Sequence, residues 1–203
     1  MNTGQIIERI KGVVMLKRDV YRTIAEDPAA TMEAWIVFVV ATVISSLPSF
    51  FTYSNPSLPS SGSINTAARF TFLGGIGSIV VNVIIGAIAM YVAAWVLAWV
   101  AVRMGGKTNT TEMLRIVGYT RVFSVIGILG LLTFVSMALA CLTGIISLVA
   151  AVLGLIGFVI GVREAAEFST SNAVIASIIA AVIQFILYAL IGGAITTAIL
   201  AVS

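Results

Sequence analysis

Long uncharged stretches alternate along this chain with short segments that carry almost all of its charge. A helix needs about 20 apolar residues to cross roughly 30 Å of hydrocarbon. The uncharged run at 122–162 is too long for one crossing, because a straight helix of that length would measure about 60 Å. We therefore expect a turn somewhere in 136–144. The predicted spans are 33–53, 78–103, 112–136, 140–162 and 172–200.

Local signals predict where several of these helices begin and end. Asp27–Pro28 has the composition of an N-cap followed by a first helical residue. Gly105–Gly106 is a typical C-terminal stop. Asn109 and Glu112 have the spacing of a capping box, which predicts a new helix at this point. Residues 54–63 are rich in Ser, Pro, Asn and Gly, and this composition predicts a loop.

The fold class predicted by this pattern is all-α, a polytopic integral membrane bundle of about five transmembrane helices. Composition agrees, since 60% of the 203 residues are hydrophobic and only 9% are charged. Soluble domains are about a quarter charged. We divide the chain into a cytoplasmic amphipathic N-terminal segment at 1–32 and a membrane domain at 33–203.

The basic residues predict the orientation of the bundle. With five spans, ten of the eleven Lys and Arg residues fall on the side that carries the N-terminus, and Arg69 alone falls on the other. Basic loops are retained in the cytoplasm. We expect the N-terminus inside and the C-terminus outside, in a prokaryotic plasma membrane.

The N-terminal segment has the periodicity of an amphipathic helix, with Ile6, Ile10 and Val13 on one face. One interpretation is a helix lying on the inner leaflet and attracted to anionic lipid. The other is a helix packed under the bundle, and the two do not exclude each other. The expected membrane-surface basic residues are Arg9, Lys11, Lys17 and Arg18.

Arg121 is the most suggestive charge, because it lies about three helical turns past Asn109 and near the membrane boundary. A charge at this depth pairs, faces a polar cavity, or extends to the headgroups. The acids that leave the fourth span on the same side are its predicted partners, with Glu164 preferred, while Arg115 and Arg103 are expected to stay with headgroups. The candidate polar or partner site comprises Arg121, Arg163, Glu164 and Glu167.

Small and uncharged polar residues inside the spans predict helix packing. Gly157 and Gly161 form a GxxxG motif, which allows two helices to approach closely. It fits either a dimer interface or packing within one chain, and the second is favoured. Asn82 and Gln184 are expected to make interhelical hydrogen bonds.

Catalytic, cofactor and metal sites have no candidates in the sequence. Histidine is absent, and Cys141 is the single cysteine. No zinc-protease, serine-hydrolase or phosphate-loop motif occurs. We expect no enzyme activity, no cofactor, no metal and no nucleic-acid partner.

Several short motifs are distributed over most of the chain. They are Ile7–Val14, Tyr21–Thr31, Gly105–Gly106 with Met113–Tyr119, Val162–Ala166 and Ser169–Thr170. Together these motifs resemble the bacterial and archaeal branch of the Yip family, whose eukaryotic members are membrane proteins that interact with Ypt/Rab GTPases.

The resemblance implies five spans with a cytoplasmic N-terminus and a non-enzymatic role in membrane organisation or trafficking. Two departures argue against GTPase binding. The segment Thr120–Ser124 lacks the proline that often follows the family's Gly-Tyr pair, and the acidic Asp-Leu-Tyr type segment of eukaryotic members is not evident.

The favoured function is therefore a non-catalytic membrane scaffold or adaptor that organises the membrane or recruits partners at the cytoplasmic face. Its expected partners are the lipid bilayer, anionic lipid of the inner leaflet and other membrane proteins. The alternatives are an accessory subunit of a larger membrane complex, or a small channel or transporter with a polar mouth near Arg121.

Overall fold

The computed structural model describes residues 3–54, 72–167 and 169–202, and these residues form helices without strands. Most of the loop expected at 54–63 lies outside the described residues. Four helices are long and apolar enough to cross a membrane, and a shorter apolar helix follows them at Thr170–Ile186. The elements are α1 (Thr3–Val14), α2 (Arg18–Glu26), α3 (Ala30–Ser54), α4 (Phe72–Arg103), α5 (Thr110–Thr120), the 3₁₀ helix η2 (Arg121–Phe134), α6 (Met137–Ala166) and α7 (Thr170–Val202).

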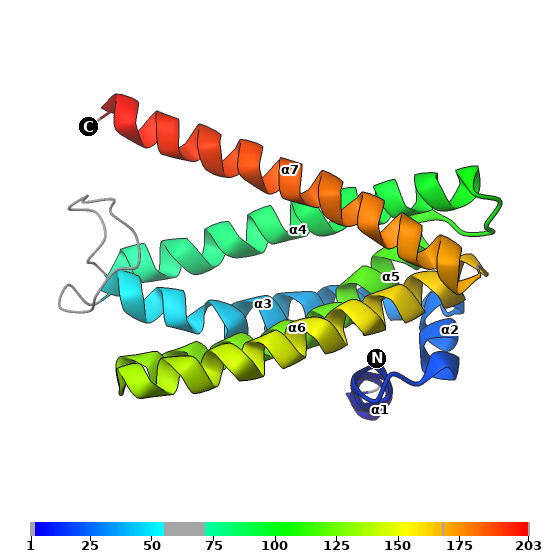
Figure 1. The fold of residues 1–203 in the computed structure, drawn as a ribbon, viewed down its shortest axis with the longest axis horizontal. Helices are drawn as coiled ribbons and strands as arrows, with labels where there is room; N and C mark the ends of the chain where they lie inside the picture. The colour runs from blue at the N-terminus through cyan, green and yellow to red at the C-terminus, as the bar shows by residue number, and fades with distance from the viewer. Residues whose placement is uncertain (1–2, 55–71, 168, 203) are drawn as a thin grey trace.

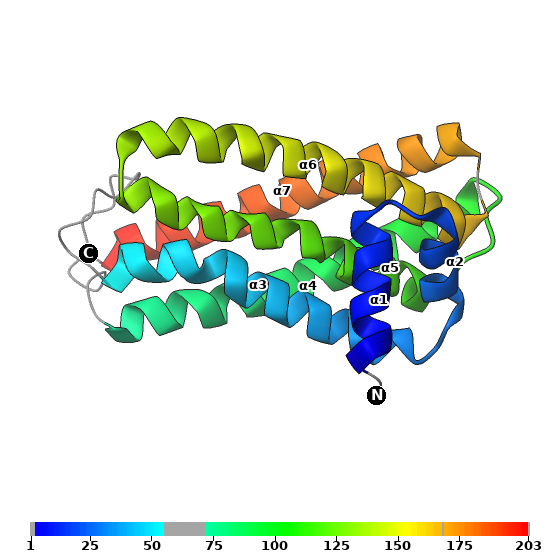
Figure 2. The same ribbon diagram turned by 90° about the horizontal axis from the view of Figure 1, so that it is seen from below.

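The long helices lie side by side, with α3 between α4 and the continuous α5–η2 rod (Figures 1 and 2). Helix α6 packs against η2, and α7 packs against α4 and α6. The sides of the bundle carry large exposed apolar side chains, as expected of surfaces that contact lipid rather than water. Examples on α3, α4, α6 and α7 are Val40, Ile84, Ile145, Leu155, Ile178 and Phe185.

The boundary between α4 and α5 confirms the local signals. Gly105 adopts φ +86°, which favours glycine. The Gly106 N–H donates to Ala101 O at 2.9 Å and the Gly105 N–H donates to Val102 O at 3.1 Å, the pair of bonds that defines a Schellman motif. Asn109 then forms the predicted capping box with Glu112.

The start of α3 differs from the prediction made for Asp27–Pro28. The first helical residue is Ala30 rather than Pro28, and Asp27 is the C-cap of α2. Its N–H donates to Thr23 O at 3.1 Å, while its carboxylate accepts from the Ala29 N–H at 2.9 Å. Asp27 thus forms an Asx-type turn between two helices rather than an N-cap.

The third crossing changes from α-helix to 3₁₀ helix at Arg121, and this change was not predicted. With three residues per turn, positions three apart share one face of η2. A β-carbon on Gly127 would lie 3.3 Å from Ser45 Cβ, and one on Gly130 would lie 3.2 Å from Pro48 Cγ, so this face lies against α3. The chain then turns at residues 135–136, at the N-terminal edge of the expected range.

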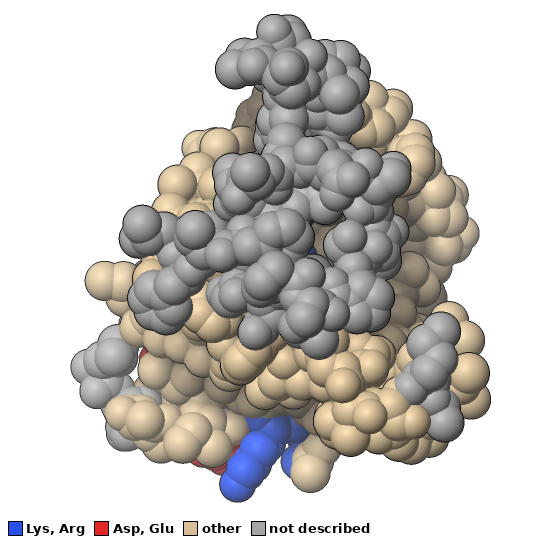
Figure 3. Space-filling model, turned by 90° about the vertical axis from the view of Figure 1, so that its left-hand side faces the viewer, with Lys and Arg blue, Asp and Glu red and all other residues tan. Residues whose placement is uncertain are grey.

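The short helices α1 and α2 gather at the end of the bundle that also carries the α4–α5 and α6–α7 connections (Figure 1). Helix α1 runs across the long axis of the bundle, and α2 packs against α5 and α6 (Figure 2). Seen from the opposite end, most of the described surface in view is uncharged, and the most prominent charged side chains lie at the lower edge (Figure 3). Charge is therefore concentrated at one end of the bundle.

Candidate functional site

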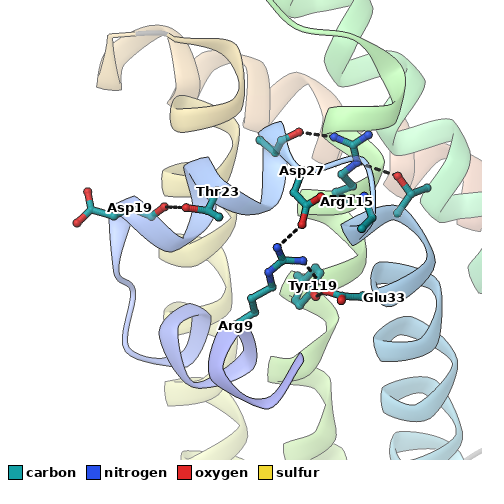
Figure 4. Close-up of polar contacts among 10 residues, drawn as sticks. Arg9, Asp19, Thr23, Asp27, Glu33, Arg115 and Tyr119 are labelled. Atoms are coloured by element: carbon teal, nitrogen blue, oxygen red, sulfur yellow. Dashed lines mark hydrogen bonds and ion pairs between the residues drawn. The ribbon is translucent and has the colours of Figure 1, made fainter. Parts of the chain in front are cut away.

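A buried ion-pair cluster joins α1 to the bundle through Arg9 (Figure 4). The Arg9 guanidinium donates to Glu33 Oε2 on α3 at 2.6 Å and forms a second ion pair with Asp27. Arg9 and Glu33 are only 6% and 4% exposed, so this pair is shielded from water. Tyr119 on α5 is fully buried and donates its hydroxyl to the same Glu33 oxygen at 2.6 Å. One carboxylate thus links α1, α3 and α5.

Arg9 is buried in this cluster, whereas an exposed position at the membrane surface was expected. Arg9 lies on the same face of α1 as Ile6 and Val13, and all three are buried. Two carboxylates compensate its desolvation, as a buried charge requires. Arg9 follows Ile6 by three residues and precedes Val13 by four, so the sequence already indicates that it lies on the apolar face of the helix.

Electrostatic interactions keep Arg9 and Asp27 ionised at neutral pH. Burial opposes the charge on Arg9, but hydrogen bonds to Asp27 and Glu33 raise its pKa overall. The hydrogen bond from Arg9, followed by that from the Ala29 N–H, lowers the pKa of Asp27. The stabilisation from Asp27 is therefore complete above its unfolded pKa of about 3.9 and is lost as the pH falls through the folded pKa.

Arg115 on α5 fastens the connection between α2 and α3. Its guanidinium donates to the backbone oxygen of Ala25, in the last turn of α2, and to Thr31 Oγ1 at 2.8 Å. The first bond satisfies a carbonyl that the end of a helix leaves without an intrahelical partner. Arg115 is 7% exposed, so it does not stay with headgroups as expected.

Tyr21, on α2, attaches this helix to α1. It is fully buried, and its hydroxyl donates to Val13 O near the end of α1 at 3.0 Å. Burial raises the pKa of Tyr21, so the hydroxyl stays protonated as a donor. Helices α1 and α2 are thus bonded to each other as well as to the bundle.

A second polar region lies between α3, α4 and η2, away from α1 and α2. Arg121 faces a cavity of about 220 Å³ and lies over the ring of Phe38, 6.0 Å from its centroid. Ser124, three residues further along η2, lines the same cavity. The 3₁₀ period explains this placement, because it puts both residues on the face of η2 that lies against α3.

A family model described as the Yip1 domain matches residues 11–192. The chain belongs to the Yip1 family. No curated protein and no solved structure matches the chain. The matched residues contain Asp27, Glu33, Arg115 and Tyr119, whereas Arg9 lies two residues before the match begins. The Yip1 domain thus supplies the acceptors of the cluster, and the segment preceding it supplies the cation.

The acids at the end of α6 in this Yip1 protein do not pair with Arg121. Glu164 lies 3.4 Å from its neighbour Arg163, and Glu167 lies 3.7 Å from Arg22 of α2. The expected Arg121–Glu164 pair is therefore wrong, because Arg121 turns towards α3 rather than α6. Arg163 also donates to Thr170 Oγ1 at 3.3 Å, across the α6–α7 connection.

The other basic residues expected at the membrane surface are exposed on α1 and α2 or between them. Lys11, Lys17 and Arg18 make no ion pair within the described part of the chain. Arg103, at the end of α4, lies over Trp99 at 5.1 Å. Trp99, Trp95 and Tyr91 are exposed at intervals of four residues along one face of α4.

The GxxxG motif packs within the chain. A β-carbon on Gly161 would lie 2.4 Å from Ile116 Cγ2, and one on Gly157 would lie 2.6 Å from the Tyr21 hydroxyl. The two glycines therefore let α6 approach α5 and α2 closely. Gln184 makes the expected interhelical bond, donating to Ala89 O on α4 at 3.1 Å. Asn82 instead donates to Ser78 O of its own helix.

Metal-binding geometry does not occur in the part of the chain that the structure describes. No three His, Cys, Asp or Glu side chains lie close enough to hold an ion there. Asp27 and Glu33 are instead engaged by Arg9.

Proposed function

We propose that this integral membrane protein of the Yip1 family is a non-catalytic scaffold. It presents α1 and α2 as a fixed docking platform at the cytoplasmic face. The observation that carries the proposal is the buried cluster around Arg9, which holds this platform to α3 and α5 of the bundle. A segment that served only as a flexible tail would not need a desolvated ion pair with two carboxylates.

The outer surfaces of the platform suit two kinds of contact. On α1, Ile7 and Val14 are each 49% exposed and Lys11 lies between them. Because α1 runs across the bundle axis, this face suits the boundary between headgroups and acyl chains, with Lys11 near anionic lipid. On α2, the exposed Arg18 and Arg22 face away from the core and suit a protein partner.

Charge asymmetry supports the proposed orientation. The described Lys and Arg residues belong to α1, α2 and their connection, to the α4–α5 and α6–α7 regions, and to the start of η2. Because basic segments are retained inside, this distribution supports a cytoplasmic position for this end and an external C-terminus. Arg69 lies outside the described residues. We assign the chain to the prokaryotic branch and to the plasma membrane on its resemblance to that branch.

The docking proposal predicts that Arg18→Glu reduces the recovery of a protein partner by about threefold or more, because a charge at the rim of an interface governs its association. A glutamate in the first turn of α2 is favourable for the helix, so the fold is retained. The measurement is quantitative mass spectrometry after gentle detergent purification of the full chain from the native host.

The matched control is Lys107→Glu, which reverses a charge at the same end of the bundle but outside the platform. The proposal expects this variant to recover partners as the wild type does. Equal losses in both variants, or no partner whose recovery depends on Arg18, would contradict a docking role for α2.

A further inference from the structure

A partly open cavity in the helix bundle has polar walls. It lies between α3, α4 and η2 and measures about 220 Å³. Thr42, Ser46 and Ser49 line it from α3, Asn82 lines it from α4, and Arg121 and Ser124 line it from η2. A cavity of this size with a cation, hydroxyls and an amide has the composition of a ligand site.

The Arg121 guanidinium has no anion to balance it within the described residues, where it makes no ion pair or hydrogen bond. Its contact is with the ring of Phe38. Glu33, one to two turns before Phe38 on α3, is already bonded to Arg9 and Tyr119. Arg121 lies 11 residues past the start of α5, or about 16 Å along the helix. A charge inside a helix bundle pairs with an anion or faces a polar cavity, and Arg121 lines such a cavity.

The donors around the cavity match an oxyanion. A guanidinium binds phosphate through two parallel hydrogen bonds, and phosphate accepts further bonds on its remaining oxygens. Ser124 now donates to Arg121 O at 2.7 Å, within its own helix. Rotation of the hydroxyl exchanges this bond for one to a bound anion. Arg121 and Ser124, three residues apart on η2, thus both offer donors to this cavity.

We propose that this cavity binds the phosphate group of an anionic ligand, with Arg121 as the principal contact. Two sources share this chemistry, a phospholipid whose headgroup enters between the helices and free inorganic phosphate. The site is separate from the docking platform, since none of its lining residues belongs to α1 or α2. It therefore does not rest on the scaffold function.

The test uses the purified full chain in a phosphate-free maltoside detergent. Inorganic phosphate is titrated by calorimetry. Short-chain phosphatidic acid is titrated with native mass spectrometry as the readout, and diacylglycerol of the same chain length is the phosphate-free control. We expect binding of phosphatidic acid or of inorganic phosphate, no binding of diacylglycerol, and at least about tenfold weaker binding in Arg121→Gln, because charge-assisted bonds are lost.

Arg103→Gln is the matched control, since Arg103 is exposed over Trp99 and lies outside the cavity. We expect it to bind as the wild type does. If phosphatidic acid binds more tightly than inorganic phosphate, the ligand is a phospholipid. If inorganic phosphate binds equally or more tightly, the ligand is the free ion. Absence of binding of both probes, or equal binding by wild type and Arg121→Gln, overturns the proposal.

Two milder substitutions keep the test decisive should Arg121→Gln not fold. Arg121→Lys keeps the charge but removes the bidentate geometry, and Thr42→Val removes one hydroxyl from the wall with little change in volume. Each should weaken phosphate binding by a factor of about three or more. Unchanged affinity in both folded variants would also overturn the proposal.

Discussion

Arg9→Leu should lower the free energy of unfolding by about 3–5 kcal/mol, because it leaves the buried Glu33 carboxylate without its cation. Glu33 is 4% exposed and accepts from Arg9 and Tyr119, so water cannot replace the lost partner. Asp27 is less affected, since its side chain keeps 28% exposure. The measurement is the thermal unfolding midpoint in detergent, which we expect to fall by about 10 °C.

The control for this substitution is Lys11→Gln, an exposed residue of the same helix, which should leave the midpoint within about 2 °C of the wild type. The double variant Arg9→Leu with Glu33→Leu should recover part of the loss, because it removes both buried charges together. An Arg9→Leu protein as stable as the Lys11→Gln control would show that the cluster contributes nothing.

Gly118→Ala should lower the free energy of unfolding by about 1–3 kcal/mol, because it forces α3 and α5 apart. The added β-carbon would lie 2.9 Å from Ala34 Cβ and 2.9 Å from Ala34 O. The second of these atoms belongs to the backbone of α3, so a change of rotamer cannot relieve the contact. Glu33 is the neighbour of Ala34, so the same separation would also disturb the cluster around Arg9.

Gly144→Ala is the matched control on α6, where a β-carbon would have no atom within 4 Å. It should leave stability unchanged or raise it by up to about 1 kcal/mol, since alanine is the better helix former. The two variants are compared by thermal unfolding in the same detergent. A Gly118→Ala protein at least as stable as Gly144→Ala would refute the close α3–α5 contact.

Helix ends and helix lengths could be predicted from the sequence because each depends on residues that are close together in the chain. The capping box at Asn109 and the Schellman motif at Gly105 each depend on a few consecutive residues. Uncharged length predicts the membrane helices for the same reason. The 3₁₀ segment was missed, although Arg121, Ser124, Gly127, Gly130 and Thr133 recur every three residues and record its period.

The cluster around Arg9 was not predictable because its partners are distant in the chain. Arg9 and Glu33 are 24 residues apart, and Glu33 and Tyr119 are 86 apart. Charged residues near a membrane are expected to stay in water or among headgroups, so Arg9 was placed there. Only tertiary structure reveals that two carboxylates and a tyrosine make its burial favourable. The predicted pairing of Arg121 with Glu164 was wrong for a related reason. The change from α-helix to 3₁₀ helix turns the Arg121 side chain towards α3 instead of α6.

The central claim is that α1 and α2 form a fixed part of the fold, and hydrogen–deuterium exchange of the full chain in detergent tests it most directly. Backbone amides in 6–13 and 18–26 should be protected in the wild type. They should exchange about 100-fold faster or more in Arg9→Leu, because local opening becomes easier when the cluster is lost. Amides of α1 and α2 that exchange in the wild type as fast as those of a free peptide would contradict the account.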